Sequence, residues 1–146
     1  MGKGCPVLKN LVALIGRICI SLVFIVSGIT HIMHHQEIVA MLPKVGITNM
    51  YWLFIVAIVL ELLGGALVFL GWFTRFGALL LIIFAIIVGV TMHMFVAQRA
   101  TQMAAQAYRY FFFLKDLAIF GGLLYLLAFG SGQYGFDRYR HRTTSM

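Results

Sequence analysis

Glu61 is a carboxylic acid in the middle of an apolar run, residues 52–71, that is long enough to cross a bilayer. An ionisable group inside hydrocarbon is costly, so such a residue is a candidate for binding or proton transfer. Other polar residues lie in or beside the remaining apolar runs, namely Ser27, His31, His93, Lys115 and Asp116. Carboxylate, imidazole and amine groups together can hold and release protons or bind the polar head of an amphipathic molecule.

The composition places these residues in a membrane protein. Of the 146 residues, 62% are hydrophobic and 10% are charged, which is outside the usual range of soluble domains. A helix needs about 20 mostly apolar residues to span the hydrocarbon, and four stretches qualify. They are residues 11–32, 50–71, 76–95 and 110–129. We therefore predict an all-α fold, a polytopic four-transmembrane-helix bundle in a single domain over residues 1–146.

The basic residues predict the orientation of this bundle, because cytoplasmic loops carry an excess of Lys and Arg. The residues predicted on one side are Lys3, Lys9, Arg75, Arg138, Arg140 and Arg142, and those on the other are Lys44, Arg99 and Arg109. Both termini are thus expected in the cytoplasm, with a basic tail at 130–146. This bias and attraction to anionic headgroups explain the net charge of +7, so we expect no nucleic-acid partner.

The depth of each polar residue in the bilayer indicates which of them can lie close together. At 1.5 Å per residue, Glu61 lies roughly 16 Å inside the outer boundary, and Lys115 and Asp116 lie roughly 10 to 12 Å below the same surface. His93 approaches this level from the opposite direction, and Ser27 and His31 complete the set. We predict a polar pocket that opens outward. The alternative is a structural clamp in which Glu61 pairs with Lys115 and nothing binds.

Paired glycines follow two of the charged residues. Glu61 precedes Gly64 and Gly65, and Asp116 precedes Gly121 and Gly122, which forms a weak internal repeat. Glycines let helix backbones approach closely in a membrane, so these four are predicted to mark the packing seam. The two helices that carry them would run parallel.

A metal site competes with the pocket. His31, His34 and His35 have helical spacing, and methionines at 33, 92 and 94 could add soft ligands for copper. Against this, Met92 and Met94 diverge from His93 on a helix, and the histidines suit a solvated helix end. We therefore assign no metal ligand. Binding of copper, or of haem between His31 and His93, is ranked below binding of a ligand in the polar pocket.

The order of these residues resembles the DoxX family. The resemblance rests on Arg17, Ser27-Gly28 with His31, Glu61-Leu-Leu-Gly-Gly65, Thr74-Arg75, His93, and Leu114-Lys-Asp-Leu-Ala-Ile-Phe-Gly-Gly122, ending at Asp137-Arg138. It implies a small four-helix protein of the bacterial cytoplasmic membrane. Some relatives accompany a quinone-reducing oxidoreductase or an oxidative-stress complex, and the resemblance assigns no catalytic residue.

Cysteine usage limits any redox role. Cys5 and Cys19 lie roughly 20 Å apart along a helix and form no Cys-x-x-Cys motif, so an autonomous thiol oxidoreductase is not expected. We predict an accessory or small subunit in membrane-linked redox, which binds a quinone or a partner oxidoreductase. The alternatives are a non-enzymatic binder or transporter of a lipid-like solute and a structural scaffold. Arg17 lies near the predicted cytoplasmic boundary, where its side chain can reach the headgroups, so it need not join the pocket. The sequence does not decide whether the protein forms homo-oligomers.

Overall fold

The computed structural model describes residues 6–41, 51–96 and 103–136, which form α-helices joined by turns. The helices are α1 (Pro6–Met33), α2 (His35–Met41), α3 (Tyr51–Leu70), α4 (Thr74–Val96) and α5 (Met103–Phe129). The four long helices correspond to the four predicted stretches, with bounds that differ by up to seven residues, and α2 is a short helix in the connection after the first. The all-α fold class is confirmed, and the single-domain organisation stays a prediction.

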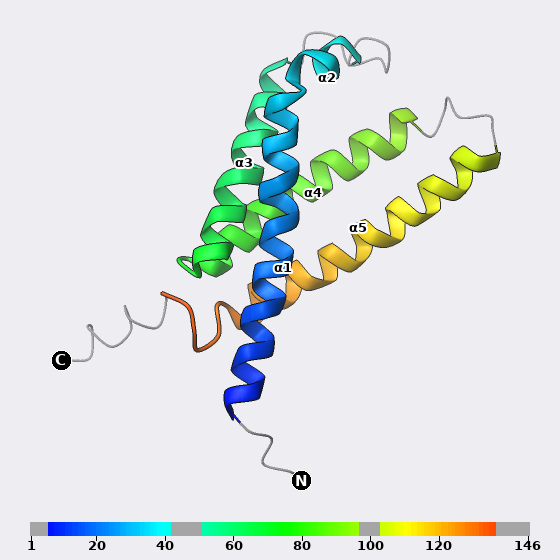
Figure 1. Ribbon diagram of the computed structural model, residues 1–146. Coiled ribbons are helices and arrows are strands. Elements are labelled where there is room, and N and C mark those ends of the chain that lie inside the picture. Colours follow the sequence, from blue (N-terminus) through cyan, green and yellow to red (C-terminus); the bar gives the residue numbers. More distant parts are fainter. Residues whose placement is uncertain (1–5, 42–50, 97–102, 137–146) are drawn as a thin grey trace.

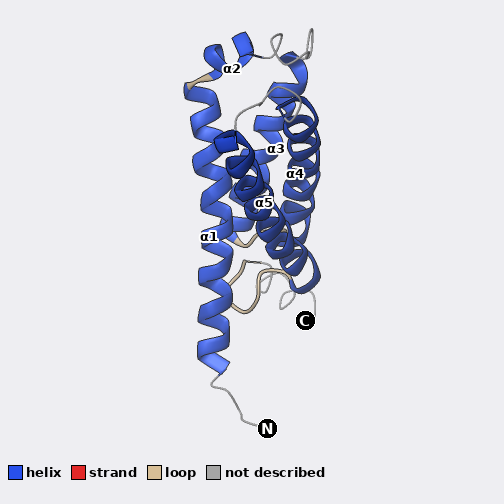
Figure 2. Cartoon of the chain, turned by 90° about the vertical axis from the view of Figure 1, so that its right-hand side faces the viewer, coloured by secondary structure: helices blue, strands red, loops and turns tan. Residues whose placement is uncertain are grey.

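The long helices pack in the order α1, α3, α4, α5. Helices α1 and α3 lie side by side, α4 packs on α3, and α5 packs on α4, whereas α1 and α5 touch over a short stretch only (Figure 1). The beginning of α1 and the end of α5 lie toward the same end of the molecule, which we call the terminal end (Figures 1 and 2). The opposite end carries α2 and is called the α2 end.

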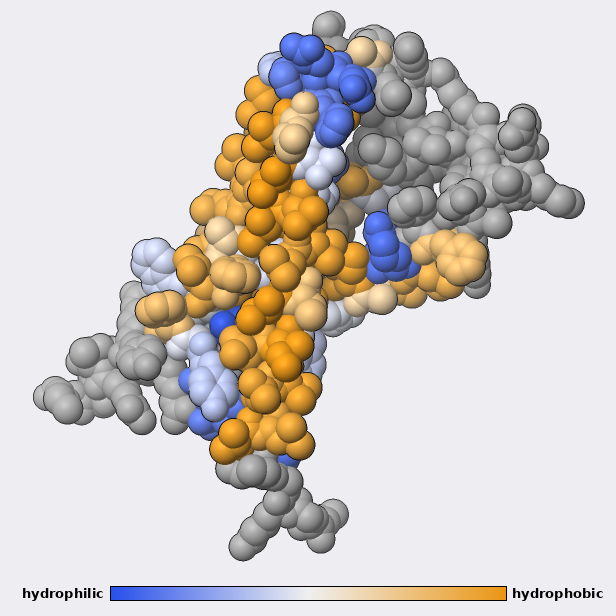
Figure 3. Space-filling view, in the orientation of Figure 1, coloured by the Kyte–Doolittle hydropathy of each residue, from blue (hydrophilic) through white to orange (hydrophobic). Residues whose placement is uncertain are grey.

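The surface of the helices is suited to lipid. Among the residues that the structure describes, two helical segments, Val7–Met33 and Tyr51–Leu70, are long and apolar enough to cross a membrane, and Thr74–Gly89 is a shorter apolar helix. Figure 3 shows an almost continuous hydrophobic surface along α1, with hydrophilic residues gathered at its α2 end. Exposed side chains such as Val12, Val26 and Val59 would be unfavourable in water and are favourable in hydrocarbon. That α4 and α5 also cross the bilayer stays a prediction.

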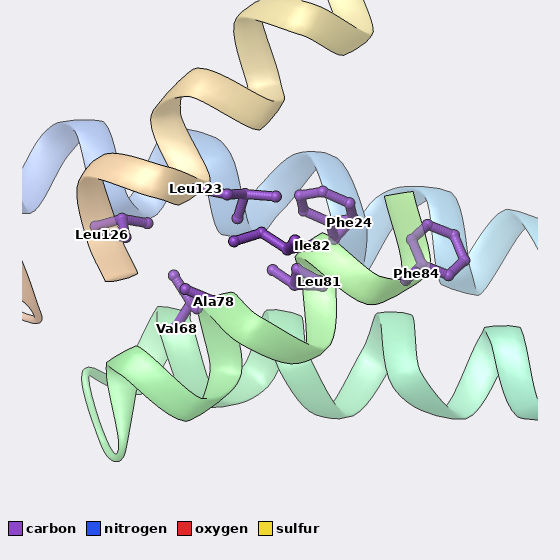
Figure 4. Packing of buried hydrophobic residues seen from close by; sticks show 8 residues of the cluster. All are labelled: Phe24, Val68, Ala78, Leu81, Ile82, Phe84, Leu123 and Leu126. Atoms are coloured by element: carbon purple, nitrogen blue, oxygen red, sulfur yellow. The ribbon is translucent and has the colours of Figure 1, made fainter. Parts of the chain in front are cut away.

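A small hydrophobic core lies around α4. Its buried side chains come from all four long helices and are Phe24, Val68, Ala78, Leu81, Ile82, Phe84, Leu123 and Leu126 (Figure 4). The rings of Phe24 and Phe84 meet edge to face with their centroids 6.0 Å apart, a favourable aromatic geometry. Because α4 supplies four of these residues, it fixes α3 and α5 on its two sides.

Glycines set the closest helix contacts. A Cβ atom at Gly64 would lie 2.8 Å from Cγ of Leu81 on α4, and one at Gly65 would lie 3.1 Å from the Ile25 side chain on α1. A Cβ atom at Gly122 would lie 2.7 Å from Ile20, whereas Gly121 is exposed and has open space around it. Of the four predicted seam glycines, three thus face a neighbouring helix and Gly121 does not.

Two arginines bind the polypeptide at the C-terminal end of α5. Arg17 of α1 is 4% exposed and donates from Nη1 to the carbonyl oxygen of Ser131 at 3.0 Å. Arg75 of α4 is exposed and donates from Nη2 to the carbonyl oxygen of Ala128 at 3.1 Å. Cations at a helix C-terminus satisfy its last carbonyl groups and interact favourably with the helix dipole. Arg17 therefore fastens α1 to the end of α5 and lies away from the residues around Glu61.

Candidate functional site

Glu61 and His31 form a hydrogen-bonded pair between α3 and α1. Oε2 of Glu61 lies 3.0 Å from Nδ1 of His31. The Glu61 side chain is 1% exposed, whereas the His31 side chain is 34% exposed. A buried carboxylate is thus connected to the molecular surface through one imidazole ring.

The sequence of α3 explains why Glu61 faces inward. Glu61, Gly64, Gly65 and Val68 are the buried residues of this helix, and their spacing of three and four residues places them on one face. Val68 belongs to the hydrophobic core, so the same face that packs against α1 and α4 carries Glu61 farther toward the α2 end. The core therefore fixes the rotation of α3 and with it the direction of Glu61.

Gly28 makes room for the carboxylate on α1. A Cβ atom at this position would lie 2.6 Å from Cδ2 of Leu62 and 3.5 Å from Oε2 of Glu61. Gly65 leaves similar room one turn farther along α3, where it faces Ile25. Together the two glycines allow α1 and α3 to approach closely enough for His31 and Glu61 to meet.

The second ring nitrogen of His31 points to the function of the pair. Among the described residues, the ring bonds through Nδ1 to Glu61, which leaves Nε2 for another molecule. An ionised carboxylate at this position would accept the hydrogen bond from an Nδ1–H group. Phe54 lies beside the ring, with centroids 6.4 Å apart and an edge-to-face geometry. A ligand at this position would therefore meet one polar atom, Nε2 of His31, beside the aromatic ring of Phe54.

The contact between Glu61 and Lys115 that the structural-clamp alternative requires is not found among the described residues. Lys115 and Asp116 are about half-exposed on α5, and Nζ of Lys115 lies 3.6 Å from Oδ1 of Asp116. Helix α4 lies between α3 and α5, so a similar depth in the bilayer does not bring Lys115 to Glu61. Among the described residues, His31 is the partner of Glu61.

The other predicted pocket residues differ in position. Ser27 is half-buried on α1, directly before Gly28. His93 belongs to α4, but its side chain lies outside the described residues. The described structure thus brings His31 to Glu61 and does not bring Lys115 or Asp116 there.

The histidines near the α2 end have separate partners. Nδ1 of His34 lies 3.7 Å from Oε2 of Glu37, and Nδ1 of His35 lies 3.2 Å from the carbonyl oxygen of Ile32. Within the part of the chain that the structure describes, no group of three or more His, Cys, Asp or Glu side chains could hold a metal ion. The geometry there gives no support to the copper alternative, and haem ligation by His93 falls outside the described side chains.

Sequence reasoning did not anticipate the roles of Gly28 and Phe54. Gly28 is three residues before His31, which is the spacing that places both on one face of α1 and was visible in the sequence. Phe54 had no signal of its own, because aromatic and aliphatic residues surround it along α3.

Comparison with known proteins supports the resemblance noted from these residues. The DoxX family model matches residues 12–94, which is more than half of the chain. The chain belongs to the DoxX family. The matched segment contains both His31 and Glu61, whereas Lys115 and Asp116 lie beyond it.

Family membership and the apolar helices together identify a DoxX membrane protein. No curated protein and no solved structure matched the chain. The functional argument therefore depends on the geometry around His31 and Glu61.

Proposed function

We propose that this DoxX protein binds a quinone in the membrane and serves as an accessory or small subunit of a membrane-linked redox system. The observation that carries the proposal is the buried carboxylate of Glu61 at 3.0 Å from the part-exposed ring of His31. Such a pair combines a protected proton-accepting group with a contact point at the lipid-facing surface.

The chemistry of a quinone fits both protonation states of His31. An imidazolium Nε2–H donates a hydrogen bond to a quinone carbonyl oxygen, and a neutral Nε2 accepts one from a quinol hydroxyl. Glu61 holds the ring in orientation from the Nδ1 side, as carboxylates do for functional histidines elsewhere. The ring of Phe54, which lies beside His31, would supply the apolar contact that a quinone ring requires.

The redox step also needs an electron donor. Reduction of a quinone to a quinol consumes two electrons and two protons, and we assign the electrons to a partner oxidoreductase. His31 and Glu61 would supply or receive one of these protons at one quinone oxygen, and the second proton would be exchanged with water at the other oxygen. This division of tasks agrees with the absence of a Cys-x-x-Cys motif from the sequence.

The proposed setting is the bacterial inner membrane with both termini in the cytoplasm. The common terminal end of α1 and α5 supports it (Figures 1 and 2). The basic residues Lys9 and Arg75 lie on elements at this end, as the distribution of positive charge in membrane proteins favours. His31 and Glu61 would then lie in the outer half of the bilayer.

The direct test is binding of a short-chain quinone to the purified full-length protein, measured by isothermal titration calorimetry in detergent. We expect His31→Leu to raise the Kd about tenfold or more, since it removes a hydrogen bond to a group that carries or shares charge. His34→Leu is the matched control, because His34 is exposed and pairs with Glu37 instead. Equal binding by all three proteins would refute the site, and saturable binding of a lipid-like solute without quinone binding would favour the transport alternative.

A further inference from the structure

A second site is suggested by a groove between α1 and α5 at the terminal end. We infer that this groove binds an anionic phospholipid from the adjoining leaflet of the bilayer. It lies at the opposite end of α1 from His31, so the inference is independent of quinone binding.

The groove exists because α1 and α5 touch over only a short stretch. Its volume is about 770 Å³, which is within the range of ligand sites in proteins. Most of its lining is apolar and includes Ile20, Tyr125 and Leu126. Water gains few hydrogen bonds in such a space, and a membrane supplies acyl chains that can fill it.

The polarity of the groove changes along its length. Lys9 and Asn10 lie at one end of the α1 lining, and Ile20 lies at the other. Lys9 and Ile20 are eleven positions apart in the sequence, which corresponds to roughly 16 Å of helix. A phospholipid has the same arrangement, with a charged headgroup at the surface and an acyl chain that extends toward the bilayer centre. The groove therefore matches a lipid that lies along α1.

The charge of the groove selects the class of lipid. Lys9 is exposed, Arg17 forms part of the lining, and among the described lining residues none is acidic. Arg17 is 4% exposed and donates hydrogen bonds to the carbonyl oxygens of Ser131 and Tyr134, so Lys9 is the basic lining residue that is accessible to a headgroup. Basic residues near the membrane surface attract anionic headgroups, so phosphatidylglycerol should bind more tightly than zwitterionic phosphatidylcholine.

Gly16 allows the groove to be filled without disturbing the fold. It lines the groove, is exposed, and has open space where a Cβ atom would be. Gly121 on α5 is also exposed and has open space, but it does not line the groove. Gly16→Leu and Gly121→Leu therefore form a matched pair in which one variant blocks the proposed site and the other does not.

The test is native mass spectrometry of the full-length protein with added phosphatidylglycerol or phosphatidylcholine of identical acyl chains. We expect the natural protein to retain phosphatidylglycerol at least fivefold better than phosphatidylcholine. Gly16→Leu should reduce this retention about tenfold, and Gly121→Leu should leave it unchanged. Lys9→Gln should weaken phosphatidylglycerol binding about fivefold, which corresponds to the attraction of one basic residue for an anionic membrane.

Three results would overturn the inference. Equal retention of the two lipids would remove the role of charge. Equal retention of phosphatidylglycerol by both glycine variants would place the lipid elsewhere on the protein. Copurification of a quinone that Gly16→Leu displaces would assign the groove to a different ligand. Circular dichroism of each variant separates these results from a loss of folding.

Discussion

Replacing His31 by leucine removes the hydrogen-bond partner that the described structure gives to Glu61. The carboxyl group is 1% exposed, so it would be left buried between α1 and α3 without the imidazole. Replacing Glu61 by methionine has a milder consequence, because the ring of His31 is 34% exposed and can turn toward the surface. The two single variants should therefore differ clearly in stability although they break the same contact.

Breaking a buried charged pair by removing one partner costs about 3–5 kcal/mol. The partial exposure of His31 lowers this cost, so we expect His31→Leu to reduce the free energy of unfolding by about 3 kcal/mol. Glu61→Met should cost about 1 kcal/mol, the typical net value of one hydrogen bond. When both partners become apolar, nothing polar remains unsatisfied, and the double variant should lie within about 1 kcal/mol of the natural protein.

The assay is equilibrium unfolding in mixed micelles, followed by circular dichroism for the natural protein, both single variants and the double variant. Adding Glu61→Met to His31→Leu should restore about 2 kcal/mol of stability, a reversal that distant sites do not produce. Additive losses in the double variant would show that His31 and Glu61 do not interact in the membrane protein.

Five further substitutions, two of which serve as matched controls, test the packing of the helices. Gly28→Ala should destabilise the protein by about 1–3 kcal/mol, because the added methyl group would collide with α3. Gly121→Ala, which meets open space, should change stability by less than about 0.5 kcal/mol in the same unfolding assay. Leu123→Ala should lower the free energy of unfolding by about 2–5 kcal/mol, and Leu124→Ala by much less, because Leu123 is 0% exposed and Leu124 is 46% exposed. Equal losses of stability in the two variants would contradict the described rotation of α5. Arg17→Met should cost about 2 kcal/mol through the lost hydrogen bonds to the end of α5, and an unchanged unfolding midpoint would contradict its buried position.

Much of the fold could be predicted from the sequence because hydrophobic length determines where membrane helices form. The predicted stretch 50–71 corresponds to α3, Tyr51–Leu70, and 11–32 corresponds to α1, Pro6–Met33. The main difference is α5, which begins at Met103 rather than near residue 110. The preceding Ala- and Gln-rich residues favour a helix without being apolar, so a hydrophobic window ends before the helix does.

The candidate site was harder to predict, and the case of Glu61 shows the reason. Counting residues from the membrane boundary gives the depth of a side chain in the bilayer. By this measure Lys115 was a suitable partner for Glu61. Partner choice also depends on the order of the helices and on the direction each side chain faces. Helix α4 separates α3 from α5, and glycines at 28 and 65 bring α1 to α3, so the partner is His31.

The central claim is tested most directly by the quinone that remains bound to the protein after gentle purification. Solvent extraction and mass spectrometry would be applied to the natural protein, Glu61→Gln and the control Glu37→Gln, whose carboxylate is 75% exposed. We predict a stoichiometric quinone in the natural protein and in Glu37→Gln, with a loss of about tenfold in Glu61→Gln. No bound quinone in any of the three, or equal amounts in all of them, would contradict the proposed function.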